Sequence, residues 1–259
     1  MKVDLHNHTT LCNHATGSVD EYVEAAIESG TEYFGFSDHA PMRYDLEYRM
    51  NFDQMDLYES WVRNASEKYQ EKITVLLGYE VDYIPGYVDE RVLNRPCDYL
   101  IGSVHFIDEW GFDNPEYIHR YQGMDMDAIY IRYFDLVEQM ALSGQFDIVG
   151  HFDLLKVFNF FPKSDIRLLA QKALKVIKKA DMAIELNVAG LRKPVAEAYP
   201  SSYLLEAIAE LEIPITFGSD AHRPDQVGMF SGEIETLAKK FGYRECATYR
   251  NRERQMIKF

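Results

Sequence analysis

The sequence predicts an α/β fold in which short parallel strands close into a barrel. Short apolar runs, rich in β-branched and aromatic residues, recur along the chain and have the character of buried strands. Amphipathic stretches with helical spacing lie between most of them. Such alternation is typical of a parallel sheet, and seven strands favour a closed barrel. An open doubly wound sheet is the alternative.

Seven runs are predicted to be strands. They are Lys2–His6, Tyr33–Ser37, Ile73–Glu80, Tyr99–Val104, Phe146–Gly150, Met182–Val188 and Ile213–Gly218. The apolar spacing predicts helices over Val19–Ser29, Asp127–Ser143, Ile166–Ala180 and Tyr203–Leu211. No linker, repeat or low-complexity tract divides the chain, so we expect residues 1–259 to form one domain. No GxGxxG motif follows the first strand, so nothing favours a dinucleotide-binding fold.

The segment Pro41–Trp61 breaks this alternation. It is long and dense in Arg, Tyr, Met and Asp. Loops that follow barrel strands carry substrate contacts, so we expect such a role here. A surface excursion that contains a helix is the alternative.

The composition excludes several classes of partner. The 259 residues carry a formal charge of −15, from 42 acidic and 27 basic side chains, and such a surface repels nucleic acid and anionic membranes. No apolar run approaches the roughly 18 residues that a membrane span needs. The first residues, MKVDLHNHTT, lack the pattern of a signal peptide, and the three cysteines are far apart. We therefore expect a cytoplasmic protein with free thiols.

Histidines gather where the predicted strands end. Six of the eight lie at or just past such an end: His6, His8, His39, His105, His151 and His222. The carboxyl ends of parallel barrel strands meet on one face. A single histidine at such a place is more often a surface or core residue, but six converging by chance is improbable. The pattern predicts one histidine-rich site.

Carboxylates accompany these histidines. Glu80 ends a strongly apolar run, and Asp220 stands two residues before His222. On a strand, Asp4 would share a face with His6 and orient it from outside the site. Imidazole and carboxylate without thiolate suit Zn²⁺, Mn²⁺ or Fe²⁺, and so many donors suit two or three ions, with Glu80 bridging. Such ions can clamp a phosphoryl group. No GxSxG motif or activated cysteine favours a covalent hydrolase.

Together these motifs resemble the polymerase and histidinol phosphatase (PHP) family. The resemblance rests on DLHNH at 4–8, His14, SDH at 37–39, Glu80, His105, His151 and GSDAH at 218–222. It implies a distorted (β/α)₇ TIM-like barrel with a trinuclear metal site. The implied ligands are His6, His8, Glu80 and Asp220 for one ion, Glu80, His105 and His151 for a second, and His14, His39 and His222 for the third. His119 is expected to lie outside the site.

Within this family, the chain is most similar to the histidinol-phosphate phosphatases. The similar stretches are SDHAPM, YIPGY, DYLIGSVHFID and ELNVAGLRKP. The resemblance implies hydrolysis of L-histidinol phosphate by a metal-bridging hydroxide, without a phosphoenzyme. The candidate catalytic residues are Glu80, Asp220, His222 and Arg192. The candidate substrate contacts are Arg192, Lys156, Arg223 and Arg43, with Lys156 standing where an arginine is expected.

Other functions stay open at this point. A related phosphoesterase acting on phosphotyrosine or a nucleotide would use the same metals, and a non-catalytic metal-binding module would use the same ligands. Cations beside the ligands favour the enzyme, since Arg192 and Arg223 are useful for holding phosphate and pointless for holding metal. The substrate's cationic end would suit a rim formed by Tyr44, Asp45, Glu47 and Tyr48, although these are equally typical of a solvated surface.

Overall fold

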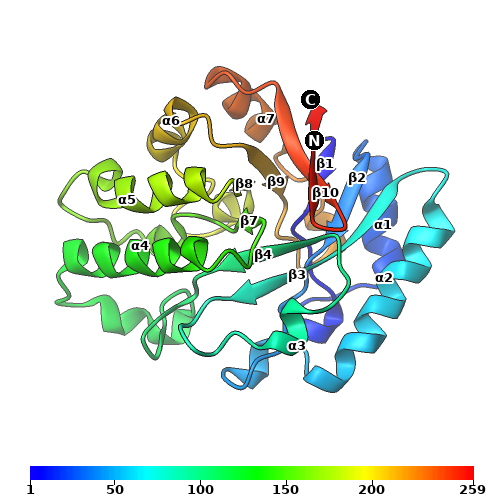
Figure 1. The fold of residues 1–259 in the computed structure, drawn as a ribbon, viewed down its shortest axis with the longest axis horizontal. Helices are drawn as coiled ribbons and strands as arrows, with labels where there is room; N and C mark the ends of the chain where they lie inside the picture. Colours follow the sequence, from blue (N-terminus) through cyan, green and yellow to red (C-terminus); the bar gives the residue numbers. More distant parts are fainter.

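A seven-stranded parallel sheet forms the centre of the molecule, in a computed structural model that describes residues 1–259 (Figure 1). The strand order is β1-β2-β3-β4-β7-β8-β9. The strands are β1 Val3–Asp4, β2 Tyr33–Phe36, β3 Thr74–Asp82, β4 Tyr99–Ser103, β7 Ile148–Val149, β8 Ala183–Asn187 and β9 Ile215–Gly218. All seven predicted strands are therefore confirmed, some of them shorter than predicted.

The first and last strands of this sheet meet, so the sheet curls into a nearly closed barrel. The amide of Leu5 donates to the carbonyl of Phe217 at 2.9 Å, and the amide of Asp220 donates to the carbonyl of His6 at 2.7 Å. The predicted barrel is confirmed, and the open doubly wound alternative is wrong. Closure matters for the site because it brings His6 and Asp220, more than two hundred residues apart, onto one rim.

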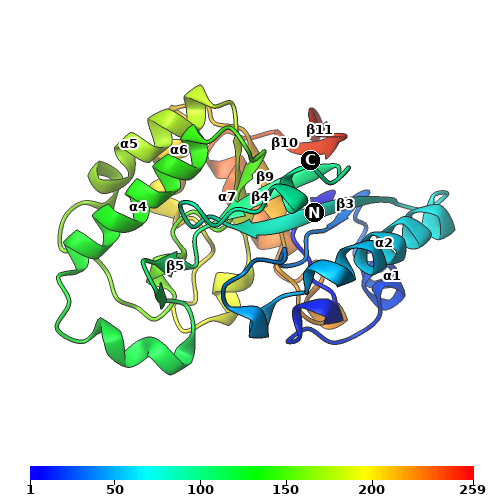
Figure 2. The same cartoon turned by 60° about the horizontal axis from the view of Figure 1, so that its bottom comes forward.

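Seven α-helices surround the sheet. They are α1 Val19–Glu28, α2 Met55–Tyr69, α3 Glu90–Leu93, α4 Met126–Leu142, α5 Ile166–Lys179, α6 Ser202–Glu210 and α7 Ser231–Lys240. Helices α1 and α2 lie on one side of the barrel, and α4, α5 and α6 lie on the opposite side (Figures 1 and 2). The four predicted helices begin and end within one residue of their observed bounds. A capping box joins Ser18 and Glu21 at the start of α1. This local motif fixes the first residue of the helix, so the beginning of α1 can be predicted from the sequence. None of the seven α-helices has the length and hydropathy of a transmembrane span.

The long segment after β2 contains a helix, as the alternative predicted, and a substrate-contacting role for its loop stays a prediction. Two short 3-10 turns, Leu46–Tyr48 and Phe52–Gln54, occupy its first part, and α2 begins at Met55. The loop portion therefore lies at the carboxyl end of β2, where it can approach the site. The helical portion returns along the outside of the barrel.

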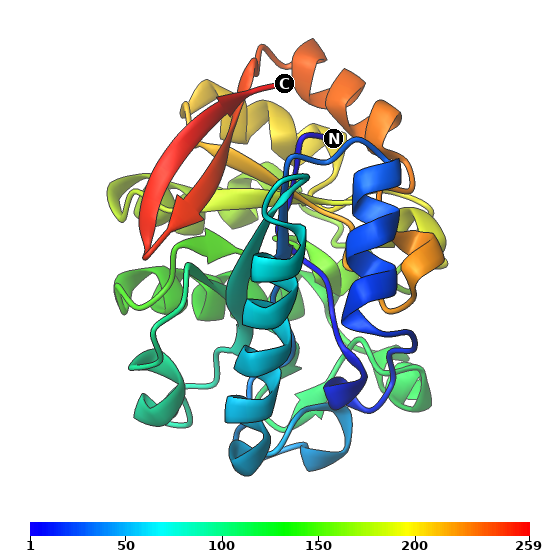
Figure 3. The ribbon, with the colours of Figure 1, turned by 90° about the vertical axis from the view of Figure 1, so that its right-hand side faces the viewer.

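Two antiparallel ribbons were not predicted. Strands β5 Phe106–Ile107 and β6 Trp110–Gly111 form a small ribbon directly after β4, and β10 Glu245–Arg250 pairs with β11 Glu253–Lys258 as a hairpin near the chain termini (Figure 3). This hairpin lies at the amino ends of the barrel strands. The Tyr249 hydroxyl donates to the carbonyl of Asp147, just before β7, and the Thr216 hydroxyl donates to the carbonyl of Ala247 at 2.8 Å. It covers the end of the barrel opposite the histidines.

Candidate metal centre and active site

The carboxyl ends of the strands bring the nine predicted ligands together. Four groups of these side chains place ligand atoms within 4.8 Å of one another. These groups are His6/His8/Glu80, His6/His151/Asp220, Glu80/His105/His151 and His14/His39/His222. The last two match two of the ion sites that the resemblance implied, and the first two share His6 and together contain the third.

Glu80 occupies the middle of the cluster. Its side chain is 1% exposed, and its Oε1 atom lies 2.9 Å from Nε2 of His151, whereas Oε2 lies 3.2 Å from Nε2 of His6 and 3.0 Å from Nδ1 of His39. The two oxygens thus face different groups of histidines, which is the arrangement of a bridging carboxylate. Burial alone would raise the pKa of Glu80, but the surrounding histidines, His6 first, hold it well below its usual range.

Several buried ring nitrogens in the cluster have no hydrogen-bond partner. They are Nε2 of His6, His8 and His222, Nδ1 of His39 and Nδ1 of His151. A buried polar atom without a partner costs about 1–3 kcal/mol. At Nε2 of His6 and of His8 the nearest carboxylate oxygens are both 3.2 Å away, on Glu80 and Asp220. Imidazole nitrogens and carboxylates converging in this way fit divalent metal ions.

Carboxylates on the outer side orient three of the imidazoles. Nδ1 of His6 faces Glu185 at 2.7 Å, Nδ1 of His8 faces Asp38 at 3.4 Å, and Nδ1 of His105 faces Asp82 at 2.6 Å. A carboxylate that accepts the Nδ1 proton fixes the tautomer in which Nε2 is free to bind a metal. Each of these histidines is therefore prepared as an Nε2 ligand.

The role that we expected of Asp4 belongs to Glu185. The Asp4 carboxylate instead accepts from the Ser219 amide at 2.8 Å and from the Ser219 hydroxyl at 2.6 Å, so it holds the turn before Asp220. Glu185 lies within β8, and its side chain also accepts from the His151 amide at 2.8 Å. The sequence signal was an acidic residue inside a buried apolar strand, which is as informative at Glu185 as it was at Glu80.

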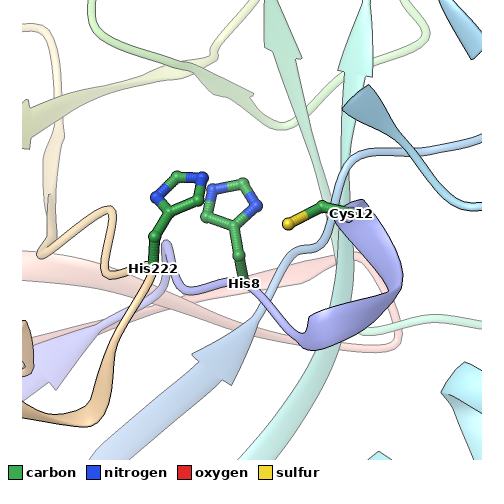
Figure 4. Close-up of side chains that lie close together, drawn as sticks. All are labelled: His8, Cys12 and His222. Atoms are coloured by element: carbon green, nitrogen blue, oxygen red, sulfur yellow. The ribbon is translucent and has the colours of Figure 1, made fainter. Parts of the chain in front are cut away.

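A thiol lies beside the cluster. Cys12, on the short turn after β1, has its side chain next to the rings of His8 and His222 (Figure 4). Burial, together with the charge of Asp38, raises the pKa of this thiol. A protonated thiol is a poor ligand and a poor nucleophile. The expected set of nitrogen and oxygen ligands therefore needs no sulfur.

The cluster opens into a cavity of about 340 Å³ that cations also line. Arg192 donates from one terminal nitrogen to the carbonyls of Ser219 and Asp220, at 2.8 and 3.0 Å, while its other terminal nitrogen is buried without a partner. Lys193 lines the same cavity and was missed in the sequence. An arginine held by two carbonyls with a donor to spare is suited to an anionic group.

A second cavity of about 240 Å³ adjoins the first. The two share His14, His39, His105 and Asp113 in their walls, and Asp45, Tyr48 and Arg49 line only the second. Asp113 was also missed in the sequence. No neighbouring side chain hydrogen-bonds its carboxyl group, and burial raises its pKa. It follows the β5–β6 ribbon, which itself was not predicted.

Three predicted substrate contacts lie elsewhere. Lys156 is 1% exposed, and its ammonium is bound by Asp153 at 3.0 Å, Glu197 at 2.8 Å and the Ala198 carbonyl at 2.7 Å. All three of its N–H groups are occupied, so Lys156 anchors a loop and offers nothing to a ligand. Arg223 is exposed and paired with Asp225, and Arg43 is exposed and lines neither cavity.

The structure also places the four residues of the proposed rim and His119. Of the proposed rim, Asp45 and Tyr48 line the second cavity, whereas Glu47 and Tyr44 line neither. The Tyr44 hydroxyl donates to the carbonyl of Glu109. His119 lies exposed on a 3-10 turn, away from the cluster.

Comparison with known proteins decides the family. The PHP domain family model matches residues 4–189 of the chain. The chain belongs to the PHP family. This family match spans seven of the nine clustered ligands, and Asp220 and His222 lie beyond it.

Relatives of this PHP protein are similar along nearly their whole length. A probable histidinol-phosphatase of Deinococcus radiodurans is 40% identical, over 97% of this chain and 98% of that protein. The histidinol-phosphatase of Bacillus subtilis is 28% identical, over 88% of this chain and 96% of that one. A crystal structure of histidinol phosphate phosphatase from Lactococcus lactis, complexed with zinc, L-histidinol and phosphate, has the same fold, with a TM-score of 0.79, 21% identity and 98% coverage of both chains.

Proposed function

We propose that this PHP protein hydrolyses L-histidinol phosphate to L-histidinol and phosphate, using two or three divalent metal ions held by the clustered ligands. The observation that carries the proposal is the juxtaposition of the metal-ligand cluster with the spare donor of Arg192 in one cavity. The names of the relatives supply the identity of the substrate. Zn²⁺, Mn²⁺ and Fe²⁺ all suit the donor set.

The phosphate end of the substrate would lie against the ligand cluster. Bound metals would supply Lewis acidity and a water deprotonated near neutral pH. Arg192 would bind the phosphoryl oxygens through the nitrogen that has no partner, and its two carbonyl contacts would hold the guanidinium in place as charge moves in the transition state. Lys193 adds a second cation to the same wall. No phosphoenzyme is expected, because the nucleophile would be a water activated by the bound metals.

The cationic end of the substrate would extend toward the second cavity. Histidinol phosphate carries an ammonium and an imidazole, and Asp113 stands where the two cavities join, with no side chain to pair its carboxyl group. The Asp45 carboxylate is less available, because it lies 3.0 Å from Arg49. We therefore assign recognition of the cationic end to Asp113 rather than to the rim that the sequence suggested.

A substrate panel tests the proposal. The values of kcat/KM for L-histidinol phosphate are compared with those for phosphotyrosine, phosphoserine and nucleoside monophosphates. A pocket that recognises both ends should favour histidinol phosphate about 100-fold or more. A flat profile, or a preference for phosphotyrosine or a nucleotide, would remove the substrate assignment but leave a metal-dependent phosphatase. A metal-loaded protein that turns over none of these compounds would indicate a binding module.

The cellular setting belongs to the same proposal. All three cysteines, Cys12, Cys97 and Cys246, are buried and free. Free thiols are typical of a reducing compartment, which supports a cytoplasmic enzyme.

A further inference from the structure

Arg49 is a buried arginine between the metal cluster and the loop that follows β2. It is 3% exposed, although it belongs to a loop, directly after the 3-10 turn Leu46–Tyr48. A buried guanidinium is costly unless nearly all of its donors are paired. The groups that pair with Arg49 therefore indicate its role.

One end of that guanidinium connects to a metal ligand. A terminal nitrogen of Arg49 donates to Oδ2 of Asp82 at 2.7 Å, and Oδ1 of the same carboxylate lies 2.6 Å from Nδ1 of His105. Asp82 is buried. Arg49 and His105 are the only charged or ionisable side chains within ion-pair distance of its carboxylate.

The other donors hold the loop. Nε of Arg49 donates to the Asp45 carbonyl at 2.7 Å, and its second terminal nitrogen donates to the Asp45 carboxylate at 3.0 Å. The Arg49 carbonyl in turn accepts from the side-chain amide of Asn13 at 3.0 Å. Asn13 immediately precedes His14, another clustered ligand. One residue thus ties the loop that lines the second cavity to the neighbourhoods of two ligands.

We propose that Arg49 is a positioning residue that holds His105 in its metal-binding orientation through Asp82. Because the same guanidinium binds both Asp82 and Asp45, the conformation of loop 41–51 and the orientation of His105 depend on each other. The guanidinium binds one oxygen of the buried Asp82 carboxylate and so holds the carboxylate with its other oxygen toward the imidazole. Removal of groups outside the ligand shell typically weakens metal binding about 10–100-fold. The ion held by Glu80, His105 and His151 should be the one affected.

Metal binding by the purified full chain, without substrate, tests this role. Apo protein carrying Arg49→Met, Arg49→Lys or no change is titrated with Zn²⁺ against a chromophoric chelator, and Co²⁺ absorption spectra report the geometry of the loaded sites. We expect Arg49→Met to weaken one binding step about 10–100-fold and to leave the others within about twofold. Arg49→Lys should restore only part of the loss, because a lysine cannot reproduce the fork.

Arg252→Met is the matched control. Arg252 also joins a loop to a largely buried carboxylate, that of Asp147, but at the opposite end of the barrel. We expect this variant to have lower thermal stability, with every metal-binding step and the Co²⁺ spectrum unchanged. Unaltered binding constants in Arg49→Met, or equal changes in Arg49→Met and Arg252→Met, would overturn the proposal. Should Arg49→Met fail to fold, Arg49→Lys takes its place, and wild-type metal binding in that variant would overturn the proposal equally. Because no substrate is present, the outcome is independent of the proposed phosphatase activity.

Discussion

Oε1 of Glu185 lies 2.7 Å from Nδ1 of His6, and both residues are fully buried. The same carboxylate accepts from the His151 amide at 2.8 Å and from the side-chain amide of Asn187 at 3.1 Å. Asn187 also donates to the Asp220 carboxylate at 3.1 Å. Glu185 is therefore the point at which three segments that carry proposed metal ligands, those of His6, His151 and Asp220, are held in register from outside the cluster.

Glu185→Gln should weaken metal binding. The amide keeps the shape but removes the charge that fixes the His6 tautomer, so we expect about a 10–100-fold loss of affinity at one ion step, with activity lost in parallel. Zn²⁺ titration and element analysis after dialysis measure it. Glu138→Gln, at a carboxylate on α4 paired with Lys172, is the control and should bind metal normally. Full metal content in Glu185→Gln would contradict the assignment.

Gly218→Ala should damage the same contact by steric means. A methyl group at this position would meet Oε1 of Glu185 at 1.9 Å and Cβ of His6 at 2.7 Å. Neither neighbour can withdraw without moving a ligand, so we expect lower thermal stability together with loss of metal. Gly232→Ala, where the added methyl group meets no atom within 4 Å, is the comparison and should be neutral or slightly stabilising. Equal melting temperatures for the two variants would refute this reasoning.

Arg192→Met should impair catalysis far more than Arg223→Met, although the sequence placed both beside the ligands. We expect kcat/KM to fall about 100-fold or more in the first variant, because the group that offsets phosphoryl charge is lost. The second variant should match the wild type, since Arg223 is exposed and paired with Asp225. Steady-state kinetics with metal content verified for each protein makes the comparison. Equal kinetics in the two variants would remove Arg192 from the proposed mechanism.

Asp113→Asn should change specificity more than chemistry. Loss of the carboxylate should reduce kcat/KM for histidinol phosphate, with a smaller effect on a phosphomonoester that has no cationic group. The ratio of the two values should shift by about tenfold, corresponding to about 1.4 kcal/mol. Asp108→Asn, at an exposed aspartate paired with Arg132, serves as control. A proportional loss on both substrates would indicate that Asp113 serves the metals or the phosphate instead.

The metal-free protein should lose stability as the pH rises, and the stabilisation that metal binding adds should grow over the same range. Burial opposes protonation of His105, yet Asp82 and Glu80 raise its pKa to about 10. Burial likewise opposes protonation of His8, yet the neighbouring carboxylates of Asp220 and Asp38 raise its pKa to about 9. Both values lie above the unfolded pKa of about 6.5, so this contribution to apo stability is complete below about pH 6.5 and is lost as pH rises through 9 to 10. Metal binding expels these protons, so metal affinity should rise over the same range.

Thermal melting of chelated and Zn²⁺-loaded protein between about pH 6.5 and about pH 9.5 checks this prediction. We expect the melting temperature of the apo protein to fall across this range, and the stabilisation gained from a fixed free Zn²⁺ concentration to grow. Apo stability that increases toward alkaline pH would show that these imidazoles are neutral before metal binds.

Chelation should also abolish phosphatase activity at every pH, and re-addition of metal should restore it.

The barrel and the convergence of histidines at its mouth are predicted from the sequence pattern, whereas His14 and the grouping of ligands into three ion sites were implied only by the family resemblance. Strand positions follow from local apolar runs, and a polar residue ending such a run, as at Glu80 or His105, must face the mouth because parallel strands share their direction. The absence of a GxSxG motif and of an activated cysteine, which is also visible in the local sequence, argued against a covalent hydrolase. These conclusions depend on spacing within one segment, so no knowledge of distant contacts was needed.

Which charged residues serve the site and which serve the fold depends on tertiary contacts. Lys156 and Arg192 both lie a few residues past a strand end. The ammonium of Lys156 is paired with Asp153 and Glu197, whereas the guanidinium of Arg192 keeps one nitrogen without a partner. Glu185, Asp113 and Arg49 owe their roles to partners that are many residues away in the chain. Side-chain direction at a loop, and the pairing of a buried charge, depend on which distant segments pack around it. Closure of the barrel sets those neighbours, and local sequence patterns do not record them.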